Sequence, residues 1–404
     1  MTADDSSVQA RYRDVFAIGE FRLLFLDSVF GSAGLALQIL ALSVFVYDRT
    51  HSALMSSIAF GAGFLSQVMG GAAFGSLADL LRPRVLIVAG DLTQAAVAAV
   101  LVVAGLPPAG DIAVVAAAAS LQPVFRAGRE ALLPDLLTAD RYVLGRSIFN
   151  LASPGAQLTA LGLGGVMLEA TGPRGVLTCT LVSYLLGALV IRIGLRDHPP
   201  RAVSIPARSL LGRSWRNNVA LLRDRRVRSL LLVQWIPVWL LVGAESLVIP
   251  YARDRGGRGG TVGWVLMALP IGMLISNATV GRLFSARAQE RLVLPLCALT
   301  GLPLLVFIVH PPLWGAALAF GTASIGLGAP VGVQAVFIDS VEEGLRGSLF
   351  VLRGTGLTTG QGLTPLLCGT LATFSGPAPA IAAAGAAIAL TALLFAGPAS
   401  SGWR

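Results

Sequence analysis

The chain has 404 residues, of which 55% are hydrophobic and only 13% are charged, and its mean hydropathy is +0.76. Ordinary soluble domains contain about 25% charged residues. The composition therefore excludes a soluble globular protein and indicates a helical protein that crosses the bilayer many times. All thirty basic residues are arginine and the net charge is +9; the arginines follow a membrane topology, so we expect no binding of nucleic acid.

Runs of about 20 apolar residues can cross a bilayer as helices, and the chain contains twelve such runs. In the first half they are Phe21–Val46, Ala53–Leu77, Val85–Gly105, Ile112–Leu133, Leu144–Leu168 and Val176–Leu195. In the second half they are Leu230–Ile249, Thr261–Phe284, Leu292–Val309, Leu313–Ile338, Leu349–Phe374 and Pro379–Ala396. We therefore predict an all-α membrane protein with twelve transmembrane helices.

One long polar stretch lies between the sixth and seventh runs. It divides the chain into a first six-helix bundle (1–195), a cytoplasmic linker (196–229) and a second six-helix bundle (230–404). If the N-terminus faces the cytoplasm, 25 arginines fall on the cytoplasmic side and five on the outer side. Since cytoplasmic loops of membrane proteins are enriched in arginine and lysine, we expect both termini and the linker in the cytoplasm.

The two halves share features at a constant spacing of 204 residues. Gln157 and Gly165 recur as Gln361 and Gly369, and the pair Gly172-Pro173 recurs as Gly376-Pro377. The spacing is close to half the chain length, which predicts a six-plus-six duplication with a pseudo-twofold relation between the halves.

Two motifs resemble those of the major facilitator superfamily of transporters. Gly75, Leu77, Ala78, Asp79 and Arg84 fit the signature loop between helices 2 and 3 of that family. Residues 125–136, with the sequence FRAGREALLPDL, resemble a run found in the branch that contains macrolide-efflux and enterobactin-exporter proteins. The resemblance implies two pseudo-symmetric six-helix bundles around a central cavity, which work by alternating access.

The resemblance also implies a cytoplasmic gate, formed by Gly75, Asp79, Arg82, Arg84, Arg129 and Arg126. In the family, the carboxylate of the signature loop bonds to an arginine of helix 4 and approaches the start of helix 11. By position, Arg129 is the first choice for the partner of Asp79, and Arg126 is the second. We expect this latch to close the cytoplasmic side in the outward-facing state; a simple capping role for Asp79 is the alternative.

Four carboxyl groups lie within the predicted membrane helices, namely Asp27, Asp91, Glu245 and, near the cytoplasmic end of its helix, Glu130. A charge at the middle of a membrane helix costs about 2.5–3.5 kcal/mol on insertion scales, so it usually faces water or a partner. The resemblance implies that the helices of Asp27 and Glu245 line the central cavity, which makes them candidates for proton coupling, with Asp91 as a third. Pairing with arginine or hydroxyl groups, or packing in the case of Asp91, is the alternative.

Polar and aromatic side chains in the predicted helices are candidates to line the substrate cavity. They are Gln38, Gln157, Gln234, Trp235, Trp239, Asn277 and Gln361. The tryptophans would suit bulky amphipathic molecules. Hydrogen bonds between helices, lipid contact or packing are the alternatives for each of them.

These features predict a secondary active transporter, with proton-coupled efflux of a drug-like or secondary-metabolite molecule as the first hypothesis. Import or facilitated transport of a small organic solute stays open, because helix 5 lacks the Gly-Pro pair that export-type relatives often carry. A non-transporting membrane sensor is a third reading.

We expect neither an enzyme nor a bound cofactor or metal. The chain has no lysine for a phosphate-binding loop, and its three histidines lie far apart in the sequence. The expected partners are a small-molecule substrate, protons and the lipid bilayer. The expected location is the bacterial inner membrane, and the expected state is a monomer.

Overall fold

The computed structural model describes residues 12–74, 80–137, 139–199, 216–284, 286–328, 337, 341 and 345–396. Within these ranges the chain is helical and contains no strand, and every one of the twelve predicted runs lies on helix. Nine helices of the described part are long and apolar enough to cross a membrane. The chain is a multi-pass membrane protein.

The described part of the first half contains seven helical elements with defined bounds. They are α1 (Tyr12–Phe16), α2 (Gly19–Thr50), α3 (Ala53–Phe74), α5 (Pro83–Val103), α6 (Pro108–Ala119), α7 (Gln122–Leu136) and α8 (Ala139–Gly194). Prolines occupy the first turns of α5, α6 and α7, where a missing N–H group leaves no hydrogen bond unmade. The fourth predicted run is divided between α6 and α7, and the fifth and sixth are joined in α8.

The second half is divided in a similar way. Its elements are α10 (Arg225–Glu245), α11 (Val248–Asp254), α12 (Gly259–Leu283), α13 (Ala286–Gly301), η1 (Leu302–Val309), α14 (Leu313–Ile325), η2 (Gly326–Gly328), α16 (Arg346–Ser375) and α17 (Pro377–Ala396). The Asp224 side chain caps α10 by accepting from the backbone N–H groups of Arg226 and Val227. The tenth predicted run continues past η2, beyond the residues that the structure describes.

The Gly-Pro pairs of the internal repeat make the same turn in each half. Gly172 has a φ of 71° and interrupts α8, while Gly376 has a φ of 85° and separates α16 from α17. A positive φ is readily adopted only by glycine, and the proline that follows starts the next helix. The duplication that the sequence predicts is therefore visible in the backbone.

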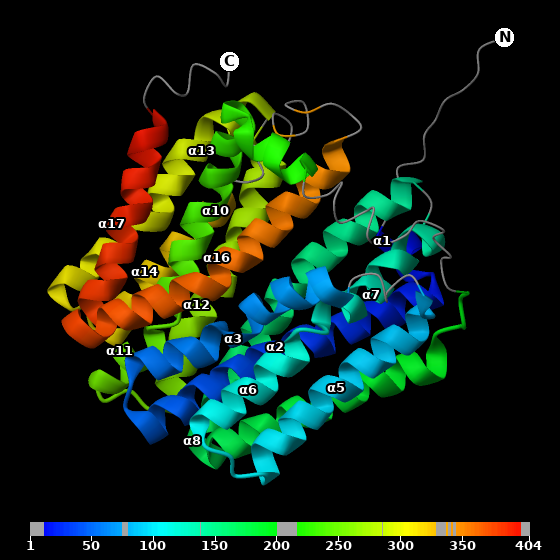
Figure 1. The fold of residues 1–404 in the computed structure, drawn as a ribbon, viewed down its shortest axis with the longest axis horizontal. Coiled ribbons are helices and arrows are strands. Elements are labelled where there is room, and N and C mark those ends of the chain that lie inside the picture. Colours follow the sequence, from blue (N-terminus) through cyan, green and yellow to red (C-terminus); the bar gives the residue numbers. More distant parts are fainter. Residues whose placement is uncertain are drawn as a thin grey trace.

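The helices of residues 12–199 gather on one side of the molecule and those from residue 216 onward on the other (Figure 1). The halves pack through α8 against α12 and through α3 against α16. At Gly165 of α8, an added Cβ would lie only 2.7 Å from the Cα of Gly263 in α12. At the repeat-related Gly369 of α16, it would lie 2.8 Å from Ser57 Cβ in α3. Small residues thus let the two halves approach at equivalent places.

The two ends of this interface differ. At the end that we call the closed end (residues 47–57, 169 and 246–260), side chains bridge the halves. Arg253 forms an ion pair with Asp48 at 2.8 Å, and Tyr47 donates to Asp254 at 3.1 Å. At the opposite end, called the linker end (residues 196–199 and 216–223), a groove of about 670 Å³ lies between α3, α7 and α16. Side chains thus bridge the halves at the closed end, and a groove separates them at the linker end.

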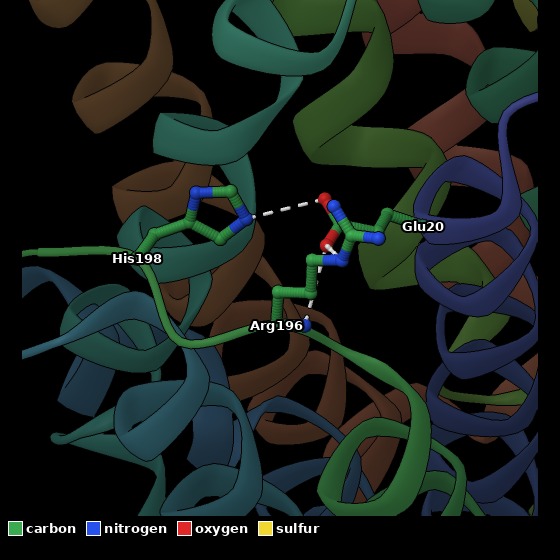
Figure 2. Close-up of polar contacts among 3 residues, drawn as sticks. All are labelled: Glu20, Arg196 and His198. Carbon is green, nitrogen blue, oxygen red and sulfur yellow. Dashed lines mark hydrogen bonds and ion pairs between the residues drawn. The ribbon is translucent and has the colours of Figure 1, made fainter.

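The first residues of the predicted linker are tied to the first half (Figure 2). Glu20, at the start of α2, accepts from the backbone N–H of Arg196 at 3.3 Å and contacts His198 Nε2 at 3.2 Å. Arg82 binds the carboxylate of Asp197. These contacts hold the start of the predicted linker and the end of α8 against α2 and α5.

Candidate transport site

A cavity of about 300 Å³ lies between the two halves. Residues of α2, α3, α8, α10, α11, α12, η2 and α16 line it. Most of the lining is apolar and includes Leu35, Phe60, Leu161, Val238, Leu266 and Met273. Glu245, the last residue of α10, is the one charged residue among the described residues of the lining. The cavity thus combines an apolar wall with a single acid.

Two glutamines accompany Glu245 in the lining. Gln157 comes from α8 and Gln361 from α16, at the repeat-related positions that the sequence singles out. The pseudo-twofold relation therefore sends one amide into the cavity from each half. An amide can both donate and accept hydrogen bonds, so the pair suits a polar group of either kind on a bound molecule.

The structure corrects the expectation that Trp235 and Trp239 line the substrate cavity. Their rings stack on each other, with centroids 5.4 Å apart, and pack on the face of α16 at Gly356 and Gly360. The indole N–H of Trp235 donates to Arg353 O at 2.9 Å, and that of Trp239 donates to Gly356 O at 3.1 Å. Both rings therefore fix α10 to α16.

Three other candidates also lie outside the central cavity. Gln234 is buried and accepts from Arg353 Nε at 2.6 Å, so it joins α10 to α16. Asn277 lies on an exposed face of α12. Gln38 is buried within the first half, where it lines a small cavity of about 50 Å³ together with Gln67 and Gln94. Of these three, Gln234 makes a hydrogen bond that joins two helices.

A cluster of buried charges occupies the first half. The Asp27 carboxylate on α2 is fully buried, and its Oδ2 lies 2.5 Å from Arg129 Nη2 on α7. Asp91 on α5 is 6% exposed, and Gly187 of α8 lies next to both Asp91 and Asp27. Tyr184 of α8 shares the cavity of about 350 Å³ that Asp91 and Arg129 line. The structure thus brings two of the three predicted proton-coupling candidates together, while Glu245 lies apart in the central cavity.

A chain of polar side chains leads from the charge cluster to the central cavity. Ser32 lines both cavities and donates to Ser153 at 3.2 Å, and Gln157 donates to the same Ser153 hydroxyl at 3.2 Å. Sequence reasoning did not single out either serine. Their one signal was a hydroxyl placed in an otherwise apolar run, and serine is common in membrane helices at interfaces of any kind.

The predicted gate residues have other partners in this conformation. Gly75 and Asp79 lie outside the described residues, so the latch stays a prediction. Arg129 pairs with Asp27, and Arg126 donates to Gln67 at 3.2 Å. Arg82 binds Asp197, and Arg84 donates to the backbone carbonyl of Arg192. Among the described residues, no group of three potential metal ligands converges.

Comparison with known proteins adds to this geometry. No family model matches the chain. The multidrug efflux pump Tap from Mycolicibacterium fortuitum is 28% identical over 320 residues, which cover 73% of this chain and 75% of Tap.

Solved transporters superpose on nearly all of the chain. The structure of peptide transporter POT in complex with sulfate matches with a TM-score of 0.78 and 14% identity, over 97% of this chain and 96% of that chain. A POT family transporter in complex with 5-aminolevulinic acid matches with a TM-score of 0.70 and 11% identity, over 95% and 98% of the two chains. These transporters have the major facilitator fold, and the likeness establishes that fold for the chain.

Proposed function

We propose that this chain, a secondary transporter with the major facilitator fold, exports bulky cationic small molecules in exchange for protons. One observation carries the proposal: Glu245 is the single charged residue among the described residues that line the apolar central cavity. A carboxylate in such surroundings is costly unless a positive charge accompanies it. Either a proton or a cationic substrate can supply that charge, and the two compete for one group. Competition of this kind is what exchange transport requires.

The direction of transport is supported by two facts. The 28% identical relative Tap carries the name of a multidrug efflux pump. The distribution of the arginines puts the linker end on the cytoplasmic side, so the described conformation would take up substrate from the cytoplasm. We further propose that the protein works as a monomer in the bacterial inner membrane, with both termini in the cytoplasm and without enzymatic activity.

Alternating access then requires the halves, 1–195 and 230–404, to move relative to each other across the linker 196–229. Closing the linker end would bring Asp79 to Arg129 or Arg126 and to the start of α16, as the family resemblance implies. Asp79→Asn would then slow transport at unchanged expression, and unchanged transport kinetics would remove the latch from this proposal.

The test uses a bacterium that lacks its main drug pumps and expresses the chain. We expect efflux of the cationic dye ethidium, and we expect a protonophore to stop it. Glu245→Gln should lower the affinity for ethidium by about 30-fold, because losing one partner of a desolvated charge pair costs about 2 kcal/mol or more.

Glu245→Asp is the matched control, because it keeps the charge and should retain efflux. A neutral dye of similar size tests the charge preference in the same cells. Faster accumulation of ethidium in cells that express the protein would indicate import and would contradict the proposed export. Equal efflux by wild type and Glu245→Gln would contradict the role of this carboxylate.

A further inference from the structure

Helix α8 passes the two acids of the charge cluster at Gly187. A Cβ built on Gly187 would lie 3.2 Å from Asp91 Oδ2 and 3.3 Å from Asp27 Oδ1. Both distances are shorter than nearly all real Cβ contacts, so a glycine is what lets α8 lie against both carboxyl groups. Both oxygens therefore lie close to the same point on the surface of α8.

The same two oxygens lack a donor. Asp27 Oδ1 and Asp91 Oδ2 are buried, and no group of the described residues donates a hydrogen bond to either. Arg129 approaches the other oxygen of Asp27, Oδ2. If both carboxyl groups are ionised, their charges repel, and neither of these oxygens has a donor among the described residues. One proton between them would give each a partner and remove the repulsion.

The count of charges around the pair leads to the same result. Besides the two acids, the charged or titratable side chains at this cavity are Arg126 and Arg129 of α7 and Tyr184 of α8, and Glu130 acts on Arg126. Arg126 and Glu130 carry opposite charges, lie four residues apart on α7 and act on each other, so together they add no net charge to the cavity. Two buried acids and Arg129, whose side chain is 25% exposed, leave one uncompensated negative charge, which a single proton neutralises.

We propose that Asp27 and Asp91 share one exchangeable proton, which makes the pair a proton site separate from Glu245. Two carboxyl groups at one site titrate as a unit, as in other carboxyl dyads. The site communicates with the linker-end groove through Gln94, Arg126 and Gln67, since adjoining cavities share these residues. Ser32 and Ser153 connect it to the central cavity.

The proposed function gives the shared proton its role in transport, although binding of the proton itself needs no substrate. One proton would replace the cation at Glu245, and a second would load the Asp27–Asp91 pair. Each cycle would then move one monovalent cation out and two protons in. One positive charge would enter per cycle, so the membrane potential would drive export.

The direct test needs no transported molecule. The infrared carbonyl-stretch band of protonated carboxyl groups is measured for the purified protein over a pH series. Asp27→Asn and Asp91→Asn should each abolish one and the same band, and the double variant should lose nothing more. Loss of two different bands from the two variants, or of no band, would overturn the shared proton.

Two further variants keep the test decisive if the asparagine variants fold poorly. Gly187→Ala keeps both acids but inserts a methyl group between them and α8, so the band should shift in frequency. Glu245→Gln is the control and should leave this band unchanged. An unshifted band in Gly187→Ala would contradict the geometry on which the proposal rests.

Transport in proteoliposomes gives a second readout. A potassium diffusion potential without a pH gradient should drive ethidium transport by the wild type, whereas Asp91→Asn should respond to a pH gradient alone. Equal response of both proteins to the potential would overturn the second proton. If no protein moves ethidium, the proposed function fails while the infrared result still decides the shared proton.

Discussion

The two halves of the molecule share one helix arrangement, but equivalent pairs of helices are joined by different side chains in each half. In the first half, α2 and α8 meet through the hydroxyl groups of Ser32 and Ser153. In the second half, α10 and α16 meet through Trp239, whose indole N–H also reaches Leu357 O at 3.1 Å. Leu357 lies 204 residues after Ser153, which is the spacing of the repeat. The duplicated contact is therefore small and polar in one half and large and aromatic in the other.

The difference indicates a division of roles. The first half buries two acids and one arginine next to water-accessible cavities, so its interior can change charge. The second half joins the corresponding helices with two stacked rings on a glycine face. Packing of this kind has no spare polar group and little room to rearrange. We infer that the first half carries the charge chemistry and the second half is the more rigid frame.

Removal of the arginine should have the largest effect, because it leaves the buried acids without their counter-charge. We expect Arg129→Leu to lower the free energy of unfolding by about 3–5 kcal/mol and to abolish transport. Thermal unfolding in detergent measures the first effect. Asp27→Asn combined with Arg129→Leu should recover much of the stability, because one uncompensated charge is gone. An Arg129→Leu protein as stable as the wild type would contradict the role given to the first half, because the buried acids would then not need a positive partner.

Loss of the stacked aromatic contact should rank second. Truncating a buried tryptophan costs about 3–5 kcal/mol, and we expect Trp239→Ala to fall at the lower limit because its ring is only half-buried. Trp239→Phe is the matched control; it keeps a ring on Gly360 but loses the indole N–H, and should cost about 1 kcal/mol. Equal stability of the two variants in thermal unfolding would show that ring packing does not hold α10 to α16.

Much of the fold follows from hydropathy and from the repeat. The apolar runs predict the helices, and the Gly-Pro pairs at 172 and 376 predict the turns, because they depend on local chemistry. The repeat also singles out Gln157 and Gln361, and the structure brings both to one cavity. These features were predictable because each is encoded within a short stretch or by its copy.

The contacts of the site were harder to predict, because they join helices that lie far apart in the sequence. Arg129 could pair with Asp79 by family position, yet it pairs with Asp27 in this conformation. From the sequence alone, the tryptophans are candidates to line the cavity, although their spacing in the sequence also indicates packing between helices. Trp235 and Trp239 are four residues apart, as are Gly356 and Gly360. Rings at that spacing on one helix fit glycines at the same spacing on its neighbour.

The contact between the halves should be weaker than the contacts within each half. Asp48 and Arg253 join the halves at the closed end and are partly exposed, and such ion pairs contribute about 0.2–1 kcal/mol. Asp48→Asn should therefore raise the population that is open at the closed end by up to about fivefold.

Labelling can follow this opening. Ser57 is fully buried at the closed end, so a Ser57→Cys variant without the three native cysteines should react with a thiol reagent only when the closed end opens. Asp48→Asn should increase the reaction rate, and Asp48→Glu should not. Identical rates in the two variants would mean that the ion pair does not hold the closed end shut.

The smallest effect on stability is expected at Ser153, which lies between the charge cluster and the central cavity. Ser153→Ala removes the hydroxyl that contacts both Ser32 and Gln157, and a hydrogen bond between membrane helices contributes only about 0.6 kcal/mol. The Asp27–Asp91 pair would keep its proton but lose its hydrogen-bonded connection to the central cavity. The carboxyl band should therefore stay in place while ethidium binding ceases to change its intensity. Ser66→Ala is the control, because the Ser66 hydroxyl bonds only to its own helix at Ala62 O. If ethidium changes the intensity of the carboxyl band equally in Ser153→Ala and Ser66→Ala, the Ser153 hydroxyl does not connect the Asp27–Asp91 pair to the central cavity. The first half would then respond to substrate without the serine contact that distinguishes it from the second half.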